Sequence, residues 1–159
     1  MRPQLHSFAQ VANRAPLAIV QRAHLGKTFS LRDTVVRTVL MKGSNGASVG
    51  LFFKMLLREE SIDPASVNCI QNLDGAMLSE LFVCSMGDYL LIDILSARTL
   101  ITRYPSEIVI AQEAVVQSGN IPWSVYYRET HSITPEVSDA QHRLCTALAQ
   151  AMEWVLTRR

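Results

Sequence analysis

The residue types best suited to binding chemistry gather in one short glycine-containing segment. Gly43-Ser44-Asn45-Gly46-Ala47-Ser48 separates a run rich in β-branched residues from an amphipathic stretch. Glycines allow the backbone to turn tightly and to approach a ligand closely. A helix that begins here presents unpaired amide hydrogens and the positive end of its dipole. The candidate ligand-binding residues of this segment are Ser44, Asn45, Gly46, Ala47 and Ser48.

Such a segment suits a carboxylate, sulfonate, phosphate or polarised heterocycle. It does not match the established nucleotide motifs, because it has no P-loop lysine and its glycines at 43, 46 and 50 miss the dinucleotide spacing. The alternative is an ordinary strand-to-helix turn that holds no ligand.

A second candidate is the pair Asp88-Tyr89, which follows Ser85-Met86-Gly87 and begins the strand expected at 88–92. An acid in this place can accept a hydrogen bond from a ligand amine or hydroxyl, because open α/β sheets bind ligands at their edges. The alternative is that Asp88 caps the preceding turn.

Catalytic and metal chemistry have little support. His142 and Cys145 are three residues apart on an expected helix, but two ligands do not make a zinc site. Ser124 lies outside a G-x-S-x-G elbow, and the three cysteines are widely spaced, which favours buried free thiols. We therefore expect no catalytic residue, no metal and no cofactor, and a binding protein rather than an enzyme.

Composition sets the class of protein. The 159 residues are 48% hydrophobic and 18% charged, which is typical of one globular domain with a real core. Fifteen basic residues nearly balance fourteen acidic ones, so nucleic acid is a poor candidate partner. The sequence shows neither a secretion signal nor a membrane-spanning run, and as it stands it predicts a cytoplasmic product.

Strand-like and helix-like patterns alternate along the chain. Residues 5–22 suggest two extended stretches that Pro16 separates. Further strands are expected at 35–41, 67–70, 88–92, 107–111 and 122–127, and helices at 47–60, 76–83, 93–101 and 135–158. This alternation predicts an α/β fold with a three-layer, mostly parallel sheet flanked by helices.

The order of several motifs resembles one protein family, the substrate-binding proteins of ABC importers for sulfonates, taurine, nitrate and thiamine pyrimidines. The similar segments are Phe29-Ser30-Leu31-Arg32-Asp33, the glycine segment 43–48, Ile62-Asp63-Pro64, Met86-Gly87-Asp88-Tyr89 and the stretch 118–124. Two positions depart from the family. Val36 stands where glycine is usual, and Asp93-Ile94 stands where a related branch often has Glu-Pro.

The resemblance implies one lobe, with hinge strands, of a type 2 periplasmic binding protein. Residues 1–28 would then be hinge-like strands and a loop, 29–133 the α/β lobe, and 134–159 a helix returning towards a missing first lobe. The resemblance adds Gln10 and Arg14 as ligand-binding residues beside Asp88 and Tyr89. It implies a small ligand such as a sulfonate, carboxylate, nitrate or pyrimidine, an ABC permease as partner and a periplasmic location for the family.

In the resembled family two lobes enclose a ligand cleft, and a single lobe would supply only one wall of it. This incomplete cleft leaves several alternatives for the function of the chain. The missing wall would come from a separate lobe in trans or from a second copy in a homodimer. The chain would otherwise be a truncated, self-associating domain without cargo. An enzyme similar to thiamine-pyrimidine-synthesis proteins is a further alternative, but Cys84 stands alone where those proteins have a cysteine-rich segment.

Overall fold

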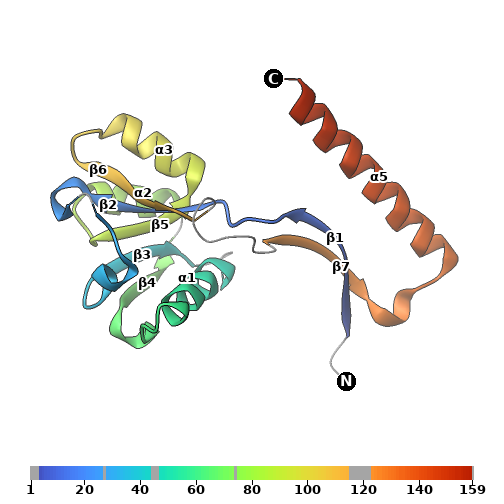
Figure 1. Ribbon diagram of the computed structural model, residues 1–159, viewed down its shortest axis with the longest axis horizontal. Coiled ribbons are helices and arrows are strands. Elements are labelled where there is room, and N and C mark those ends of the chain that lie inside the picture. The colour runs from blue at the N-terminus through green and yellow to red at the C-terminus, as the bar shows by residue number, and fades with distance from the viewer. Residues whose placement is uncertain (1–3, 27, 44–46, 74, 115–122, 159) are drawn as a thin grey trace. The chain divides into compact units, whose positions relative to one another are not determined.

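A computed structural model describes residues 4–26, 28–43, 47–73, 75–114 and 123–158 (Figure 1). The chain divides into two compact units. We call Pro16–Gly119 the sheet unit, and Met1–Ala15 together with Asn120–Arg159 the hairpin unit.

The sheet unit is built on one mixed sheet. In the described residues its five strands follow the order β4-β3-β5-β2-β6. The strands are β2 (Leu17–Arg22), β3 (Thr38–Lys42), β4 (Asn68–Leu73), β5 (Tyr89–Asp93) and β6 (Ile108–Glu113). Strand β3 runs parallel to both β4 and β5, whereas β2 is antiparallel to both β5 and β6. Four strands therefore point the same way, as expected for a mostly parallel α/β sheet.

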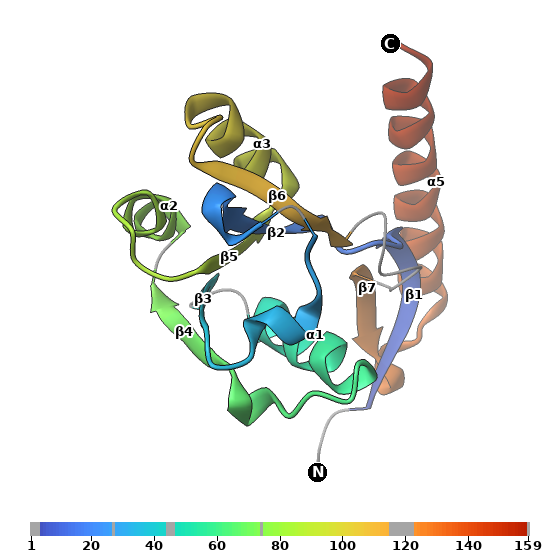
Figure 2. The ribbon, with the colours of Figure 1, turned by 60° about the vertical axis from the view of Figure 1, so that its left-hand side comes forward.

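Helices cover both faces of this sheet (Figure 2). Helix α1 (Ala47–Glu59) lies on one face, and α2 (Gly75–Val83) and α3 (Ile94–Arg103) lie on the other. The strands are consequently apolar on both sides, as the unbroken buried run Val39, Leu40 and Met41 shows. Short 3-10 helices complete the described elements of both units: η1 (Ala23–Leu25), η2 (Leu31–Thr34), η3 (Pro64–Ser66) and η4 (Thr130–Ser132).

One hydrophobic core cluster lies under α2 and α3. Leu78 and Phe82 of α2 and Leu100 of α3 pack with alternate residues of the central strands. The alternation is visible in β5, where Leu90 and Ile92 face this cluster. On the other face, Phe53 and Leu57 of α1 are fully buried. The helical spacing of apolar residues in the sequence correctly predicted this covering helix.

The start of β3 differs from the sequence prediction. The β-branched run favoured a strand over 35–41, but the strand begins at Thr38. Val36 instead has φ 57° and is 88% exposed, so it lies in the left-handed region that β-branched residues rarely adopt. This is the position where the resembled family usually has glycine, and the backbone conformation explains that preference.

Replacing Val36 with glycine is therefore expected to raise the free energy of unfolding by about 1 kcal/mol, because the left-handed conformation costs about 1–2 kcal/mol for an L-residue. Val35 provides the matched control, since its backbone is extended with φ −63°. Val35→Gly should destabilise by about 0.5–1 kcal/mol instead. Urea unfolding followed by circular dichroism measures both, and equal effects would contradict the explanation.

The hairpin unit contains β1 (Leu5–Ala12), β7 (Ser124–Glu129) and α5 (Pro135–Thr157). The two strands pair antiparallel, with Leu5 opposite Glu129. Helix α5 begins where the sequence predicted, with Thr134 capping the amide of Val137. None of the residues of α5 is buried. In the described part of the chain, no helix has the length and apolar character needed to cross a bilayer.

The first expected segment, residues 1–28, is shared between the two units. Strand β1 belongs to the hairpin unit, whereas β2 lies between β5 and β6 in the sheet of the other unit. Whether the boundaries expected at 28 and 133 delimit independent domains stays a prediction.

Candidate functional site

The carboxyl ends of β3, β4 and β5 lie at one edge of the sheet, because these strands are parallel. Helices α1, α2 and α3 begin just beyond those ends. We call this place the carboxyl edge and define it by Lys42, Leu73 and Asp93, with the first turns of the three helices. Open α/β sheets bind ligands beyond the carboxyl ends of their strands, so a ligand site is expected at this edge.

The glycine segment lies at the carboxyl edge. Lys42 ends β3, and Ala47 begins α1. Ser44, Asn45 and Gly46 lie outside the described residues, and their part in binding stays a prediction. Ser48 is in the first turn of α1, a helix of 13 residues. The backbone amides of that turn have no carbonyl of the helix to bond, which is the local chemistry that favours an anion.

Gly50 allows α1 to pass close to β4. A Cβ atom at this position would meet the side-chain nitrogen of Gln71 at 2.7 Å. That nitrogen, Nε2, lies 3.2 Å from Sδ of Met41 and donates a hydrogen bond to it. The absence of a side chain at Gly50 thus lets the start of α1 sit over β3 and β4.

Asp88 lies at the opposite edge of the sheet. Its Oδ2 accepts a hydrogen bond from the amide of Thr38 at 2.9 Å, and its Oδ1 pairs with Nη1 of Arg37 at 3.2 Å. Thr38 begins β3 and Lys42 ends it. These residues are four apart, or roughly 13 Å along the strand. The structure therefore does not bring Asp88 to the glycine segment. Its carboxylate instead joins the starts of β3 and β5.

Tyr89 is a core residue. It is 3% exposed, and its ring packs edge-on against Phe29 at 5.5 Å between centroids. Burial raises the pKa of the Tyr89 hydroxyl, and the negative charge of Asp33 raises it further. Tyr89 therefore presents almost no surface to a ligand in the sheet unit.

Gln10 and Arg14 belong to the hairpin unit. The Gln10 side chain is exposed, and its Nε2 donates to the carbonyl of Ala12 at 3.4 Å. Arg14 is also exposed and lies between β1 and the sheet unit in sequence. Their part in ligand binding stays a prediction.

Asp93 is the acidic residue that sequence reasoning missed. It ends β5 at the carboxyl edge, is exposed, and accepts a hydrogen bond from the amide of Ser96 at 2.9 Å. Burial by itself raises the pKa of the Asp93 carboxyl, but hydrogen bonds from the Ser96 amide and hydroxyl outweigh it, so the pKa lies below its ordinary value. The available signal was an acid directly after the buried run 89–92 and three residues before a serine.

Asp93→Ala should lower the free energy of unfolding by about 1 kcal/mol through loss of this helix cap, whereas Asp93→Asn should nearly keep it. The folded-state pKa is below the ordinary 3.8, so the stabilisation by the charge is complete above that value and is lost as the pH falls through the folded-state pKa. Urea unfolding between pH 7 and 3 measures this effect. In Asp93→Asn the free energy of unfolding should fall less between pH 7 and 3 than in the wild type. An equal fall in both proteins would contradict the stabilising role of the Asp93 charge.

A second acid at the carboxyl edge is already paired. Glu113 ends β6, which points the same way as β5 because both are antiparallel to β2. Its Oε1 lies 3.4 Å from Nη2 of Arg98. Among the described residues that define this edge, the charges that remain available are those of Lys42 and of Asp93, whose carboxylate bonds to the first turn of its own helix. A polar solute with both an anionic and a donor group suits this arrangement.

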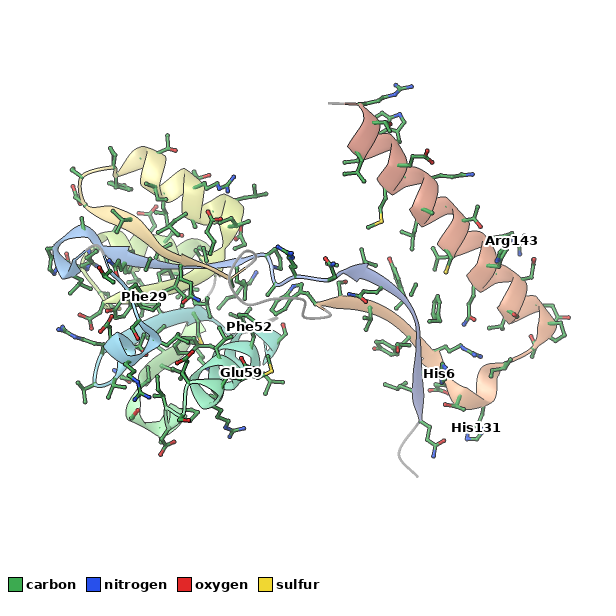
Figure 3. All side chains as sticks on the ribbon, viewed as in Figure 1. His6, Phe29, Phe52, Glu59, His131 and Arg143 are labelled. Carbon is green, nitrogen blue, oxygen red and sulfur yellow. The ribbon has the colours of Figure 1, made fainter. Side chains whose placement is uncertain are left out.

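The thiols and histidines form no metal site in the described residues, because nowhere among them do three His, Cys, Asp or Glu side chains converge. His6 and His131 are exposed in the hairpin unit (Figure 3). The expectation of buried thiols is wrong, because Cys84 is exposed and Cys69 and Cys145 are half-buried. Burial raises the pKa of the Cys69 thiol despite the nearby Lys54, so it is not an activated nucleophile.

Solved structures are similar to nearly the whole chain at low sequence identity. An ancestral arginine-binding protein bound to arginine is 14% identical, over 94% of this chain and 59% of that one, with a TM-score of 0.65. The periplasmic aliphatic sulphonate binding protein of Escherichia coli is 12% identical, over 89% and 47%, with a TM-score of 0.65. The alkanesulfonate-binding protein of Xanthomonas axonopodis pv. citri, bound to MOPS, is 11% identical, over 96% and 46%, with a TM-score of 0.56.

No protein-family model and no curated protein matches the sequence. The chain spans about half the length of the solved structures to which it is similar. At these identities the likeness concerns the fold. The chain thus has the α/β fold of one lobe of periplasmic solute-binding proteins.

Proposed function

We propose that this chain is a solute-binding domain that holds a small anionic or heterocyclic solute at the carboxyl edge. One observation carries the proposal: α1, α2 and α3 all begin at this edge. The N-termini of these helices carry partial positive charge, which favours an anionic group at this edge. The amides for such a group come from α1, because the carbonyl of Pro16 and the carboxylate of Asp93 already accept from the first turn of α3. The fold shared with arginine- and sulfonate-binding proteins supports the same function.

Different groups at this edge bind different parts of the solute. The first turn of α1, with Ser48 and with Ser44, Asn45 and Gly46 before it, binds the anionic group. Asp93, rather than Asp88, accepts from a donor group of the same solute, since Asp93 ends β5 at this edge. By likeness to its structural neighbours, the domain works outside the cytoplasm with an ABC permease.

Affinity is expected to be weak. Small-molecule sites normally enclose most of the ligand surface, and the chain spans about half of its structural neighbours. A solute on one exposed edge gains fewer contacts against the same entropic cost of binding. A separate lobe that covers the edge would raise the affinity.

Isothermal titration calorimetry tests the proposal with methanesulfonate, taurine, nitrate, benzoate, arginine and 4-aminopyrimidine. At least one solute should bind saturably. Ser48→Asp should abolish anion binding while keeping the helix, because a carboxylate in the first turn is favourable for α1 but repels the anion. The matched control Ser48→Asn should bind like the wild type. Absence of binding by every solute to folded protein would refute the proposal.

A second candidate is self-association through the hairpin unit, and a specific observation favours it. No residue of α5 is buried, and a groove of about 370 Å³ beside it is wholly apolar. The groove is lined by Val11, Leu148, Ala151, Met152, Val155 and Leu156. A two-stranded hairpin and an exposed amphipathic helix gain stability when a partner covers the apolar face of the helix.

Sedimentation velocity tests this second candidate. The wild type should form a concentration-dependent dimer, and Val155→Asp should make it monomeric, because the substitution places a charge in the apolar groove. Gln150→Asp, at an exposed position of α5 that does not line the groove, is the matched control and should leave the dimer intact. A wild type that stays monomeric at all concentrations would refute self-association.

A further inference from the structure

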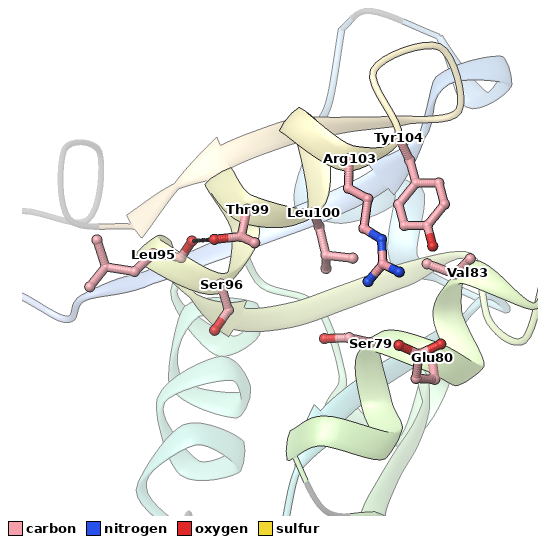
Figure 4. A pocket seen from close by; sticks show the side chains of 9 residues that line it. All are labelled: Ser79, Glu80, Val83, Leu95, Ser96, Thr99, Leu100, Arg103 and Tyr104. Carbon is pink, nitrogen blue, oxygen red and sulfur yellow. Dashed lines mark hydrogen bonds between the residues drawn. The ribbon is translucent and has the colours of Figure 1, made fainter.

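A second hollow lies on the face of the sheet unit that α2 and α3 cover (Figure 4). It runs between the two helices and has a volume of about 300 Å³. Leu100, which is 8% exposed, and Val83 supply apolar surface along it. We call this hollow the α2–α3 groove. Its volume is at the lower end of the range for small-molecule sites, about 300–1,000 Å³.

Two opposite charges stand on facing walls of the α2–α3 groove. Glu80 comes from α2, and Arg103 comes from the last turn of α3. Figure 4 shows the guanidinium of Arg103 reaching across the groove towards α2. Within the described part of the chain, neither side chain makes an ion pair or a hydrogen bond. An anionic and a cationic group thus face the same small space without such partners.

Other polar side chains also line the α2–α3 groove. The guanidinium carbon of Arg103 lies 5.6 Å from the ring centroid of Tyr104, which limits where the cation can move. Ser79 directs its hydroxyl into the space from α2 (Figure 4). Thr99 is already engaged, because its hydroxyl donates to the carbonyl of Leu95 at 3.0 Å. The hydroxyl of Ser96, which also lines the groove, bonds to Asp93. The groove therefore offers a cation, an anion and the hydroxyls of Ser79 and Tyr104 beside apolar surface.

We propose that the α2–α3 groove binds a small zwitterion, an amino carboxylate, at the end that Glu80 and Arg103 line. The other end of the groove, with Leu95 and Ser96, adjoins the first turn of α3 at the carboxyl edge. The carboxylate of the solute pairs with Arg103, its ammonium group pairs with Glu80, and its apolar part covers Leu100 and Val83. A solute with only one charge would leave the opposite wall charge unpaired, so charge complementarity selects the zwitterion. Arginine suits the carboxylate because its planar fork of donors matches both oxygens.

The test is a heteronuclear NMR titration of the full chain with L-leucine. Amide shifts should change saturably at the groove residues that lie away from the carboxyl edge: Glu80, Val83, Leu100 and Arg103. Two analogues, 4-methylpentanoate and isoamylamine, carry one charge each on a similar carbon frame. Each should bind at least about tenfold more weakly, because one charged hydrogen-bond partner is lost.

Variants of the two wall charges test whether both of them hold the zwitterion. Arg103→Gln and Glu80→Gln should each weaken L-leucine binding about tenfold. Arg98→Gln is the matched control on α3, since Arg98 pairs with Glu113 and does not line the groove. It should bind like the wild type.

Three outcomes would overturn the proposal: no shift changes at the groove in folded protein, unchanged binding in Arg103→Gln, or shift changes only around Lys42 and Asp93. The last outcome would instead place L-leucine at the carboxyl edge, so the two sites are distinguished. Binding by the groove with no solute bound at the carboxyl edge would leave this inference standing while the proposed function failed.

Discussion

Replacing Phe53 with alanine is expected to lower the free energy of unfolding by about 3–5 kcal/mol. Phe53 is 0% exposed and is among the largest fully buried side chains of the chain. It lies on the face of α1 that covers the sheet. Removing its ring loses the buried apolar surface and leaves a cavity, because the surrounding strands relax only in part.

The same helix supplies the matched control. Leu51 is two residues away and 68% exposed, so Leu51→Ala should change the free energy of unfolding by no more than about 0.5 kcal/mol. Urea denaturation followed by circular dichroism measures both variants. Effects of similar size would show that α1 does not cover the sheet with the face that contains Phe53.

Replacing Gly87 with alanine is the second large effect, with an expected loss of about 2–4 kcal/mol. Gly87 has φ 75°, which is unfavourable for a residue with a side chain. A Cβ atom there would also lie 2.9 Å from Cγ of Leu40, a fully buried core residue. The turn before β5 cannot move away freely, because Nε of Arg22 donates to the carbonyl of Gly87 at 3.2 Å.

Gly26 separates the backbone contribution from the contact with Leu40. It has φ 107°, yet a Cβ atom there would meet nothing within 4 Å. Gly26→Ala should therefore cost only the backbone strain, about 1–3 kcal/mol, and less than Gly87→Ala. Thermal and urea unfolding rank the two variants. A smaller loss for Gly87→Ala would contradict the close packing of this turn on β3.

The sequence by itself determined the elements and the fold class. Apolar residues at helical spacing between 47 and 60 predicted α1, and Pro135 predicted the start of α5. These signals are local, because a helix face and a helix cap depend on residues within one or two turns. The alternation of strands and helices predicted a mostly parallel sheet, because short connections between elements allow few topologies.

The bounds of a strand were predicted less accurately where one backbone angle outweighed the pattern of side chains. Val35 and Val36 favoured a strand by composition, but the turn into β3 requires φ 57° at Val36. The sequence also did not predict the order of the strands in the sheet. The placement of β2 between β5 and β6, antiparallel to both, depends on contacts between segments far apart in the chain.

The tertiary structure alone decided which charged residues share an edge with the glycine segment. Asp88 and Asp93 stand at the two ends of the same strand, and both are acids beside an apolar run. Only the parallel register of β3 and β5 places Asp93 with Lys42 and leaves Asp88 bonded to Thr38. That register is fixed by side-chain packing on both faces of the sheet, a non-local property that residue types and spacing do not encode directly.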